Sequence, residues 1–265
     1  MKALIVSLLM ASSVFAATIE EAKNLYSTRE STGKALEQAL NAATMYENLA
    51  KNETDSKAKA ELLIEASRSY YFYANHLTDN AKKETLHENA KNIATKAIEL
   101  AQQLKDNDLE ARATYQFGAN LGKWAEARGI GASLGEWPSL RDSMERIIKD
   151  LKKPETESAG ALRILGRAYF KLPGLLGGSN KKSLQYLNKA NQMTLLPEAG
   201  ISSNPTNIVY LAETMIEENQ ITLAKALLNK FVDFVEANGA EKYNSELIPE
   251  TMDEVANAKK VLNKL

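Results

Sequence analysis

The most informative absence is that of cysteine: the 265-residue chain has none, and it has only two histidines. Without cysteine the protein forms no disulfide, carries no lipidated N-terminal cysteine and offers no thiolate ligand to zinc. The two histidines, His76 and His87, are too few for a credible Ser-His-Asp set, and we interpret both as surface or packing residues. The sequence therefore predicts no catalytic residues, no metal and no cofactor, and we expect a protein that is not an enzyme.

An excess of charge of one sign is also absent, since 33 Lys and Arg are balanced by 34 Asp and Glu, for a net charge of −1. This balance does not favour nucleic acid or an anionic membrane surface as the partner. Glycine and proline are few, and 44% of the residues are hydrophobic. Such a composition is typical of a globular chain and not of a disordered one.

Long hydrophobic runs are confined to the N-terminus, where MKALIVSLLMASSVFA begins with one lysine and continues as an apolar segment. Val14 and Ala16 supply the small residues of a cleavage site, so residues 1–16 are predicted to be a signal peptide. No other apolar stretch approaches the length of a membrane span. We therefore expect an exported, soluble protein of the periplasm, and not a lipoprotein.

What the chain does have is helical periodicity. Between Thr85 and Leu104 apolar residues recur every three or four positions, and the same spacing runs through residues 56–77 and 35–49. Stripes of this kind form the core-facing sides of amphipathic helices. No alternating, strand-like run is visible, so the predicted fold class is all-α.

The helices are further predicted to form hairpins of the tetratricopeptide-repeat (TPR) type, in which small residues at the crossing let two helices approach closely. Ala212 and Ala224 stand twelve residues apart, which is the regular spacing of this repeat, whereas Gly166 and Ser183 are seventeen apart. Five residues are therefore expected to be inserted into the turn of the earlier hairpin.

The organisation predicted from these repeats is a single TPR-like domain over residues 17–265, a solenoid or bundle with a C-terminal capping helix. The stretch IGASLGEWP, residues 130–138, is expected to be a joining loop anchored by Trp137. The final helix, with Met252 and Val255 on its apolar stripe, is expected to cover the last hairpin.

The inserted turn, YFKLPGLLGGSNKKS, combines residues that stop helices and tighten turns. Pro173 disfavours helical geometry at the residue before it, so the first helix is predicted to end near Lys171. Gly174, Gly177 and Gly178 permit positive φ and close backbone approach, and the serine that follows can cap the next helix. The spacing does not fit a phosphate-binding P-loop, because no strand precedes it and no Gly-Lys-Ser/Thr ends it.

Two stretches resemble a known family: ANLGKWAEARG and LGRAYFKLPGLLGGSNKKSLQYLNKA. Both are similar to the T-component family associated with TRAP transporters, over roughly residues 109–231. The resemblance implies an exported, all-helical repeat bundle, often oligomeric, with a channel or pocket lined by apolar and polar side chains. It also implies a role in partnering a periplasmic solute-binding subunit or passing it a ligand. Some members of this family are lipoproteins, and a chain without cysteine cannot be one.

Several residues are candidates for binding because their side chains have a reason to face something other than the core. Tyr71 and Phe72 belong to a run of four aromatics that cannot share one helix face, so they face a neighbouring helix, an interface or a groove. Trp124, with the amide of Asn120 and the ammonium of Lys123 nearby in sequence, is a candidate pocket wall. Two arginines four residues apart could meet an anion near the glycine turn or pair with Glu155 or Glu157. The remaining candidates are Asn120, Lys123, Trp124, Arg163, Arg167 and Tyr169.

Two functions follow as expectations. The first is a non-enzymatic periplasmic TPR-like protein that engages a partner protein, such as a solute-binding subunit, or a small, partly apolar solute, in association with a TRAP-type transport system. The second is a structural scaffold for envelope proteins that binds no small molecule, in which the inserted turn serves an oligomer contact. A homo-oligomer is compatible with both, and a hydrolase is disfavoured because no nucleophile–base pair is visible.

Overall fold

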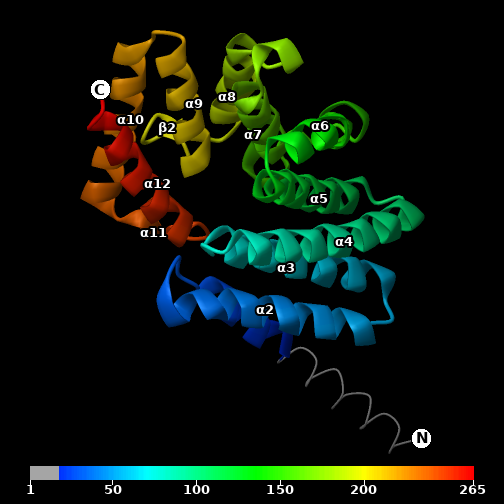
Figure 1. Cartoon of the computed structure of the whole chain (residues 1–265). Helices are drawn as coiled ribbons and strands as arrows, with labels where there is room; N and C mark the ends of the chain where they lie inside the picture. The colour runs from blue at the N-terminus through cyan, green and yellow to red at the C-terminus, as the bar shows by residue number, and fades with distance from the viewer. Residues whose placement is uncertain (1–17) are drawn as a thin grey trace, which may run out of the picture. The chain divides into compact units, whose positions relative to one another are not determined.

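The computed structural model describes residues 18–265, so the predicted signal peptide at residues 1–16 lies outside the described residues. The described chain folds into helices joined by short turns, and its only strands are two residues long each (Figure 1). The all-α, helical-hairpin prediction is therefore confirmed. Within residues 18–265 no helix is both long and apolar enough to cross a bilayer.

Contacts divide the chain into two compact units, one that ends at Ser133 and one that covers Leu134–Leu265. The expectation of a single domain over residues 17–265 stays a prediction. In the first unit, residues 18–27 are helical and neighbouring helices pack in chain order, with α3 touching α5 as well as α4. The helices of this unit are α2 (Gly33–Asn52), α3 (Ser56–Asn75), α4 (Asn80–Leu104) and α5 (Asn107–Arg128).

Aspartates begin three of these helices. Asp55 accepts from the amide of Ala58, Asp79 from that of Ala81, and Asp106 from that of Leu109. Each carboxylate satisfies an amide that has no partner within its own helix, which typically contributes about 1 kcal/mol.

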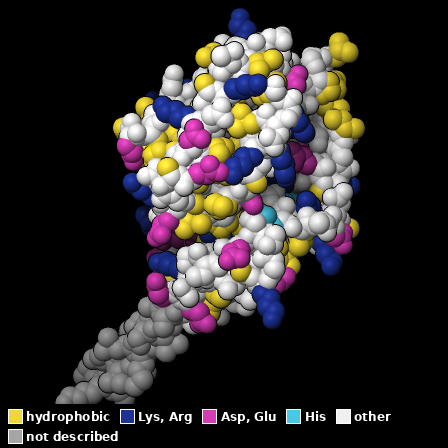
Figure 2. Space-filling model, turned by 90° about the vertical axis from the view of Figure 1, so that its left-hand side faces the viewer, with side chains coloured by type: hydrophobic (Ala, Val, Ile, Leu, Met, Phe, Trp, Pro, Cys, Tyr) yellow, Lys and Arg dark blue, Asp and Glu magenta, His cyan; other side chains and the backbone are white. Residues whose placement is uncertain are grey.

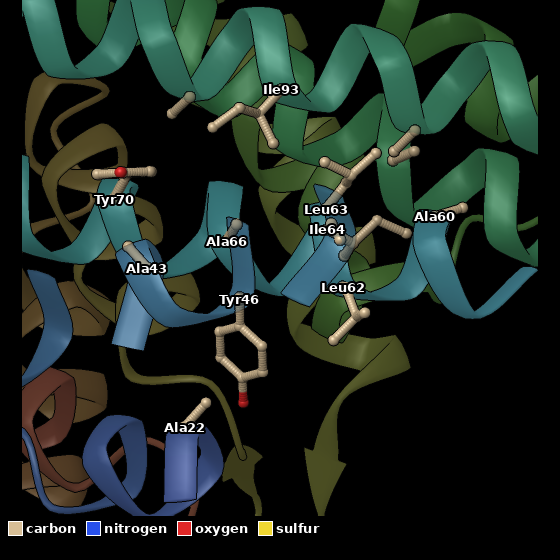
Figure 3. Packing of buried hydrophobic residues seen from close by; sticks show 14 of the residues in the cluster. Ala22, Ala43, Tyr46, Ala60, Leu62, Leu63, Ile64, Ala66, Tyr70 and Ile93 are labelled. Carbon is tan, nitrogen blue, oxygen red and sulfur yellow. The ribbon is translucent and has the colours of Figure 1, made fainter. Parts of the chain in front are cut away.

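The core of the first unit is rich in alanine, which allows its helices to lie close together. Figure 3 shows Tyr46 projecting from α2 toward Ala22, and Ala66 of α3 beside the layer that carries Ile93. Alanines on the crossing stripes are fully buried, among them Ala90 and Ala97. The periodicity of the sequence thus identified the faces that pack.

The second unit contains two helical hairpins, α7–α8 and α9–α10, followed by α12, which packs on both helices of the second hairpin. The predicted C-terminal capping helix is therefore confirmed. Its buried stripe includes Val255, but Met252 is exposed, which corrects the expected stripe. The helices of this unit are α6 (Ile130–Glu145, beginning within the first unit), α7 (Thr156–Lys171), α8 (Asn180–Met193), α9 (Pro205–Glu217), α10 (Ile221–Asn238), α11 (Ala240–Tyr243) and α12 (Ile248–Leu262), with a π-helical turn at Arg146–Asp150 and a 3₁₀ turn at Gly174–Leu176.

Close helix approach is visible at the α7–α8 crossing. A Cβ atom on Gly166 would lie 2.5 Å from Cγ of Leu187, so no larger residue fits without movement. Ala190, also on this crossing, is fully buried, as are Ala212 and Ala224 on the α9–α10 hairpin. The small residues that predicted the hairpins therefore do lie where the helices meet.

Two local expectations were wrong. Residues 130–138 are not a loop, because they form the first part of α6, with Pro138 inside the helix. Trp137 does act as an anchor, since its ring meets that of Tyr169 edge-on with centroids 5.2 Å apart. A short antiparallel ladder, β1 (Leu195–Leu196) with β2 (Ile201–Ser202), was also not predicted.

Candidate functional site

Asn120 is the most deeply buried of the candidate residues and is fully enclosed. Its Oδ1 accepts from Nδ1 of His87 at 2.9 Å, while its Nδ2 donates to Oγ of Ser67 at 3.1 Å and to the backbone oxygen of Gln116 at 3.0 Å. Ser67 in turn donates to the backbone oxygen of Ala90. Because this network ties α3, α4 and α5 together through hydrogen bonds, Asn120 has a structural role.

His87 is buried beside this amide, with 1% of its surface exposed. Its pKa is lowered to about 4, mainly by burial and also by the charges of Lys123 and Lys83, while the hydrogen bond with Asn120 acts in the opposite direction. Tyr71 meets the imidazole edge-on at 5.7 Å. His87 is therefore a neutral packing residue at ordinary pH. Among residues 18–265, no three His, Asp or Glu side chains gather closely enough to hold a metal ion.

Trp124 has two cations close to its ring and is 8% exposed. Nζ of Lys91 is 4.3 Å from the ring centroid and Cζ of Arg128 is 4.8 Å from it. Lys123 points to Glu126, with Nζ 2.9 Å from the carboxylate. The three candidates on α5 therefore have different surroundings.

Tyr71 and Phe72 also face different neighbours. Phe72 is 3% exposed and packs against Leu36 and Ala39 of α2. The guanidinium of Arg29 lies 4.6 Å from its ring centroid. Of the neighbouring helix, interface or groove expected for these two residues, the structure shows neighbouring helices, α4 for Tyr71 and α2 for Phe72.

Arg163, in the second unit, is used at the beginning of α7. Its Nη1 donates to the backbone oxygen of Ser158 at 3.0 Å and to Oδ1 of Asn207 at 3.1 Å. Glu157, Ser158 and Ala159 all have positive φ, a conformation that costs about 1–2 kcal/mol per residue. The buried guanidinium stabilises this turn, so Arg163 has a structural role.

Arg167 differs from the other candidates because its surroundings are both polar and partly open. It forms an ion pair with Glu213 of α9, and the two side chains remain 21% and 30% exposed. Its Cζ lies 4.1 Å from the ring centroid of Tyr210 and 5.2 Å from that of Phe170. We call these four residues, Arg167, Phe170, Tyr210 and Glu213, the α7–α9 face.

A second carboxyl group lies near this face, on α12. Burial raises the pKa of Glu254 above its usual range, and the charge of Glu213 raises it further. Hydrogen bonds from Asn257 and Thr206, together with the charge of Arg167, act in the opposite direction. Together with Glu254, the α7–α9 face therefore offers one guanidinium, two carboxyl groups and two aromatic rings. Such a set can hold a ligand or a peptide segment by charge-assisted hydrogen bonds and ring contacts.

Tyr169 lies on the other side of α7, toward α8. It stacks on Tyr186 with ring planes 6° apart and centroids 5.7 Å apart, and Nζ of Lys182 lies 4.9 Å from its ring centroid. Its backbone oxygen accepts from the amide of Ser179 at 2.9 Å. Tyr169 therefore supports the inserted turn and is separate from the α7–α9 face.

The inserted turn is built as its residues predict except at Gly174, which has neither a positive φ nor a close backbone neighbour. Helix α7 ends at Lys171, and Ser179 caps α8 by accepting from the amide of Lys182. Gly177 has a φ of 95°, and a Cβ on Gly178 would lie 1.8 Å from the backbone oxygen of Leu172. Pro173 precedes the 3₁₀ turn that Gly174 begins, and a Cβ on Gly174 would meet only open space.

The sequence missed the residues that complete the α7–α9 face. An ion pair for Arg167 was one of the two alternatives considered, but the partner is Glu213 and not Glu155 or Glu157. Tyr210 and Glu254 were not singled out. No local signal marks them, because they reach Arg167 only through the packing of α9 and α12.

Comparisons with known proteins identify no family. No protein-family model and no curated protein matches the chain. One solved structure that it resembles is described as "Computational Design of Self-Assembling Cyclic Protein Homooligomers". The two chains are 18% identical, with 100% of this chain and 98% of that chain covered, at a TM-score of 0.24.

Proposed function

We propose that this is a non-enzymatic periplasmic TPR-like binding protein. It engages a partner protein or a small, partly apolar solute, and it works in association with a TRAP-type transport system. The observation that carries this proposal is the α7–α9 face, where an ion pair and two aromatic rings stay partly exposed.

The physical basis is the contrast between this face and the other polar candidates. Asn120 and Arg163 form hydrogen bonds with other residues of the protein interior, and Trp124 is nearly enclosed. Arg167 and Glu213 can exchange part of their mutual interaction for contacts with a ligand, because both side chains reach solvent. The two rings supply apolar area beside these charges.

Native mass spectrometry of the protein purified from an exporting bacterial host tests the proposal, together with crosslinking in the periplasm. We expect a bound small molecule or one defined protein partner, and its loss in Arg167→Ala. The matched control is Lys259→Ala, which removes the ion pair with Glu236 elsewhere in the same unit. Melting curves of both variants separate lost binding from lost folding.

Three outcomes are distinguished. Loss of the ligand or the partner in Arg167→Ala but not in Lys259→Ala supports the proposal. A stable protein complex that never carries a small molecule and is indifferent to Arg167→Ala favours the scaffold function instead. Turnover of peptidoglycan or of a simple ester would overturn both.

A further inference from the structure

The tip of the inserted turn carries two apolar side chains into solvent. Leu175 is 102% exposed and Leu176 is 49% exposed, and both lie in the 3₁₀ turn that connects α7 to α8. Leucine in such a position loses the free energy that burial would give it. Scattered exposed leucines are ordinary, but here two adjacent ones occupy the most exposed point of a connection that is longer than its hairpin requires.

The turn that presents them is held by its own backbone. The amides of Leu176 and Gly178 both donate to the backbone oxygen of Pro173, at 2.9 and 3.0 Å, and that of Gly177 donates to Gly174. Gly178 packs against the chain so closely that no Cβ fits. The apolar tip is therefore preorganised, and ordering it on contact with another surface costs little entropy.

The turn is flanked along the chain by positive charges for which no ion pair is seen within residues 18–265. Residues 158–197 contain Lys and Arg but no Asp or Glu, although the whole chain has a net charge of −1. Lys171, Lys181 and Lys182 are exposed on both sides of the turn, and within residues 18–265 none of them forms an ion pair. Glu145 of α6 lies close enough to Tyr186 of α8 to affect its pKa, but this carboxylate is already paired with Lys149. Asp142 of α6 is likewise paired with Arg141.

We propose that this turn docks the protein on an anionic lipid surface. Leu175 and Leu176 enter the boundary between headgroups and acyl chains, while the three lysines contact lipid phosphates. An anionic lipid surface binds apolar side chains and nearby lysines without requiring a complementary shape. A specific protein interface instead needs about 1,200 Å² of contact and is usually centred on Trp, Tyr or Arg, which two leucines do not supply.

This inference goes beyond the proposed binding function and refines the expectation drawn from total charge. The balanced composition argued against an anionic membrane partner. On the face drawn in Figure 2, acidic and basic side chains are indeed interspersed. Net charge, however, averages over the molecule, whereas attraction to a surface depends on charges within about 10 Å of it at 0.1 M salt.

Vesicle flotation tests the proposal, with vesicles of phosphatidylglycerol and phosphatidylethanolamine compared with vesicles of phosphatidylcholine. The protein is purified after export and its N-terminus is checked by mass spectrometry, because an uncleaved apolar segment would bind vesicles by itself. We expect binding to the anionic vesicles only, and weaker binding as salt rises. Replacing both leucines by serine should weaken binding at least tenfold, since each leucine buries several CH₂ groups worth about 0.8 kcal/mol apiece.

The charge contribution is tested separately. Changing Lys171, Lys181 and Lys182 to Gln should weaken binding about 100-fold, at about fivefold for each lysine. Two controls should bind like the wild type. They are Leu223→Ser, which changes another exposed leucine of the same unit, and a triple Lys→Gln variant at Lys34, Lys96 and Lys105, which matches the charge change in the other unit.

The results decide between lipid and protein. Binding that both turn variants lose and both controls keep supports the proposal. It is overturned by absence of binding to anionic vesicles, or by binding that the turn variants leave unchanged. It is also overturned if the turn variants lose a defined protein complex while no vesicle binding is detected. None of these outcomes depends on Arg167, so the proposed binding function is tested independently.

Discussion

Acidification is expected to destabilise the unit that ends at Ser133 through His87. In the folded protein Nδ1 of His87 donates to Oδ1 of Asn120, and burial holds the pKa of the imidazole at about 4. In the unfolded chain the pKa returns to about 6.5. The unfolded state therefore binds a proton between these two values and the folded state does not, so stability is full above pH 6.5 and is lost as the pH falls toward 4.

The magnitude follows from the difference between the two pKa values. Each pKa unit corresponds to about 1.4 kcal/mol, which gives a loss of about 2 kcal/mol at pH 5 and about 3 kcal/mol at pH 4. Because His87 is 1% exposed, solvent screening reduces this effect little. Lys83 and Lys123 disfavour the charged imidazole, and Glu126 acts against them.

The assay uses the distribution of tryptophan. Trp124 and Trp137 are the two tryptophans of the chain, and each belongs to a different unit. In a Trp137→Phe background, fluorescence therefore reports on the unit that contains His87. Urea unfolding at pH 7.5, 6 and 5 gives the free energy of unfolding at each pH. We expect His87→Gln to lower stability at pH 7.5 and to remove about 2 kcal/mol of the decrease between pH 7.5 and 5.

His76→Gln is the matched control, because this second histidine is only partly buried and should leave the pH slope in place. The proton NMR spectrum of a chain with two histidines also allows the pKa of His87 to be measured directly in the folded state. If that pKa lies near 6.5, or if His87→Gln unfolds with the same pH slope as the wild type, the reasoning is wrong.

Two further predictions concern the second unit, and both are measured by urea unfolding with Trp137 fluorescence in a Trp124→Phe background. Gly178→Ala should destabilise this unit by about 1–3 kcal/mol, because the new Cβ collides with the backbone oxygen of Leu172. In the control Gly174→Ala the new Cβ meets open space, so stability should change by less than about 0.5 kcal/mol. Equal effects of the two variants would contradict the geometry. Glu254→Gln should stabilise the unit at pH 8 and lose this advantage at pH 4. The pKa of Glu254 is raised in the folded state, so its contribution is present at low pH and is lost as the pH rises through the folded pKa; an unchanged or lower stability at pH 8 would contradict the pKa direction.

The parts of the fold that were predicted correctly depend on neighbouring residues in the sequence. Pro173 ends α7 and Ser179 begins α8 through interactions that span a few residues. Gly166 at the helix crossing was identified from the spacing of small residues along two adjacent helices. Local chemistry and periodicity are enough in such cases, because the local conformation that these residues favour is also the one that the packed fold requires.

What was missed depends on contacts between distant segments. The glycines and Pro138 of residues 130–138 are signals for a loop, yet the segment is helical, and Trp137 packs on Tyr169. Tertiary packing overrides weak local preference in this way. Likewise Arg167 finds Glu213 across the packing of α7 on α9, a pairing that no spacing within either helix indicates.

The same comparison separates polar residues that build this fold from those that are available for binding. Asn120 lies on the stripe that packs α5 against its neighbours, so its amide is satisfied by the helices it joins. Arg167 lies one turn beyond the buried Arg163 and stays partly exposed, while Leu175 stands entirely outside the packed helices. In a helical-hairpin protein the small residues fix which side of each helix is buried. Polar residues on that side therefore hold the helices in register, and binding falls to side chains just off the stripe or on the connections.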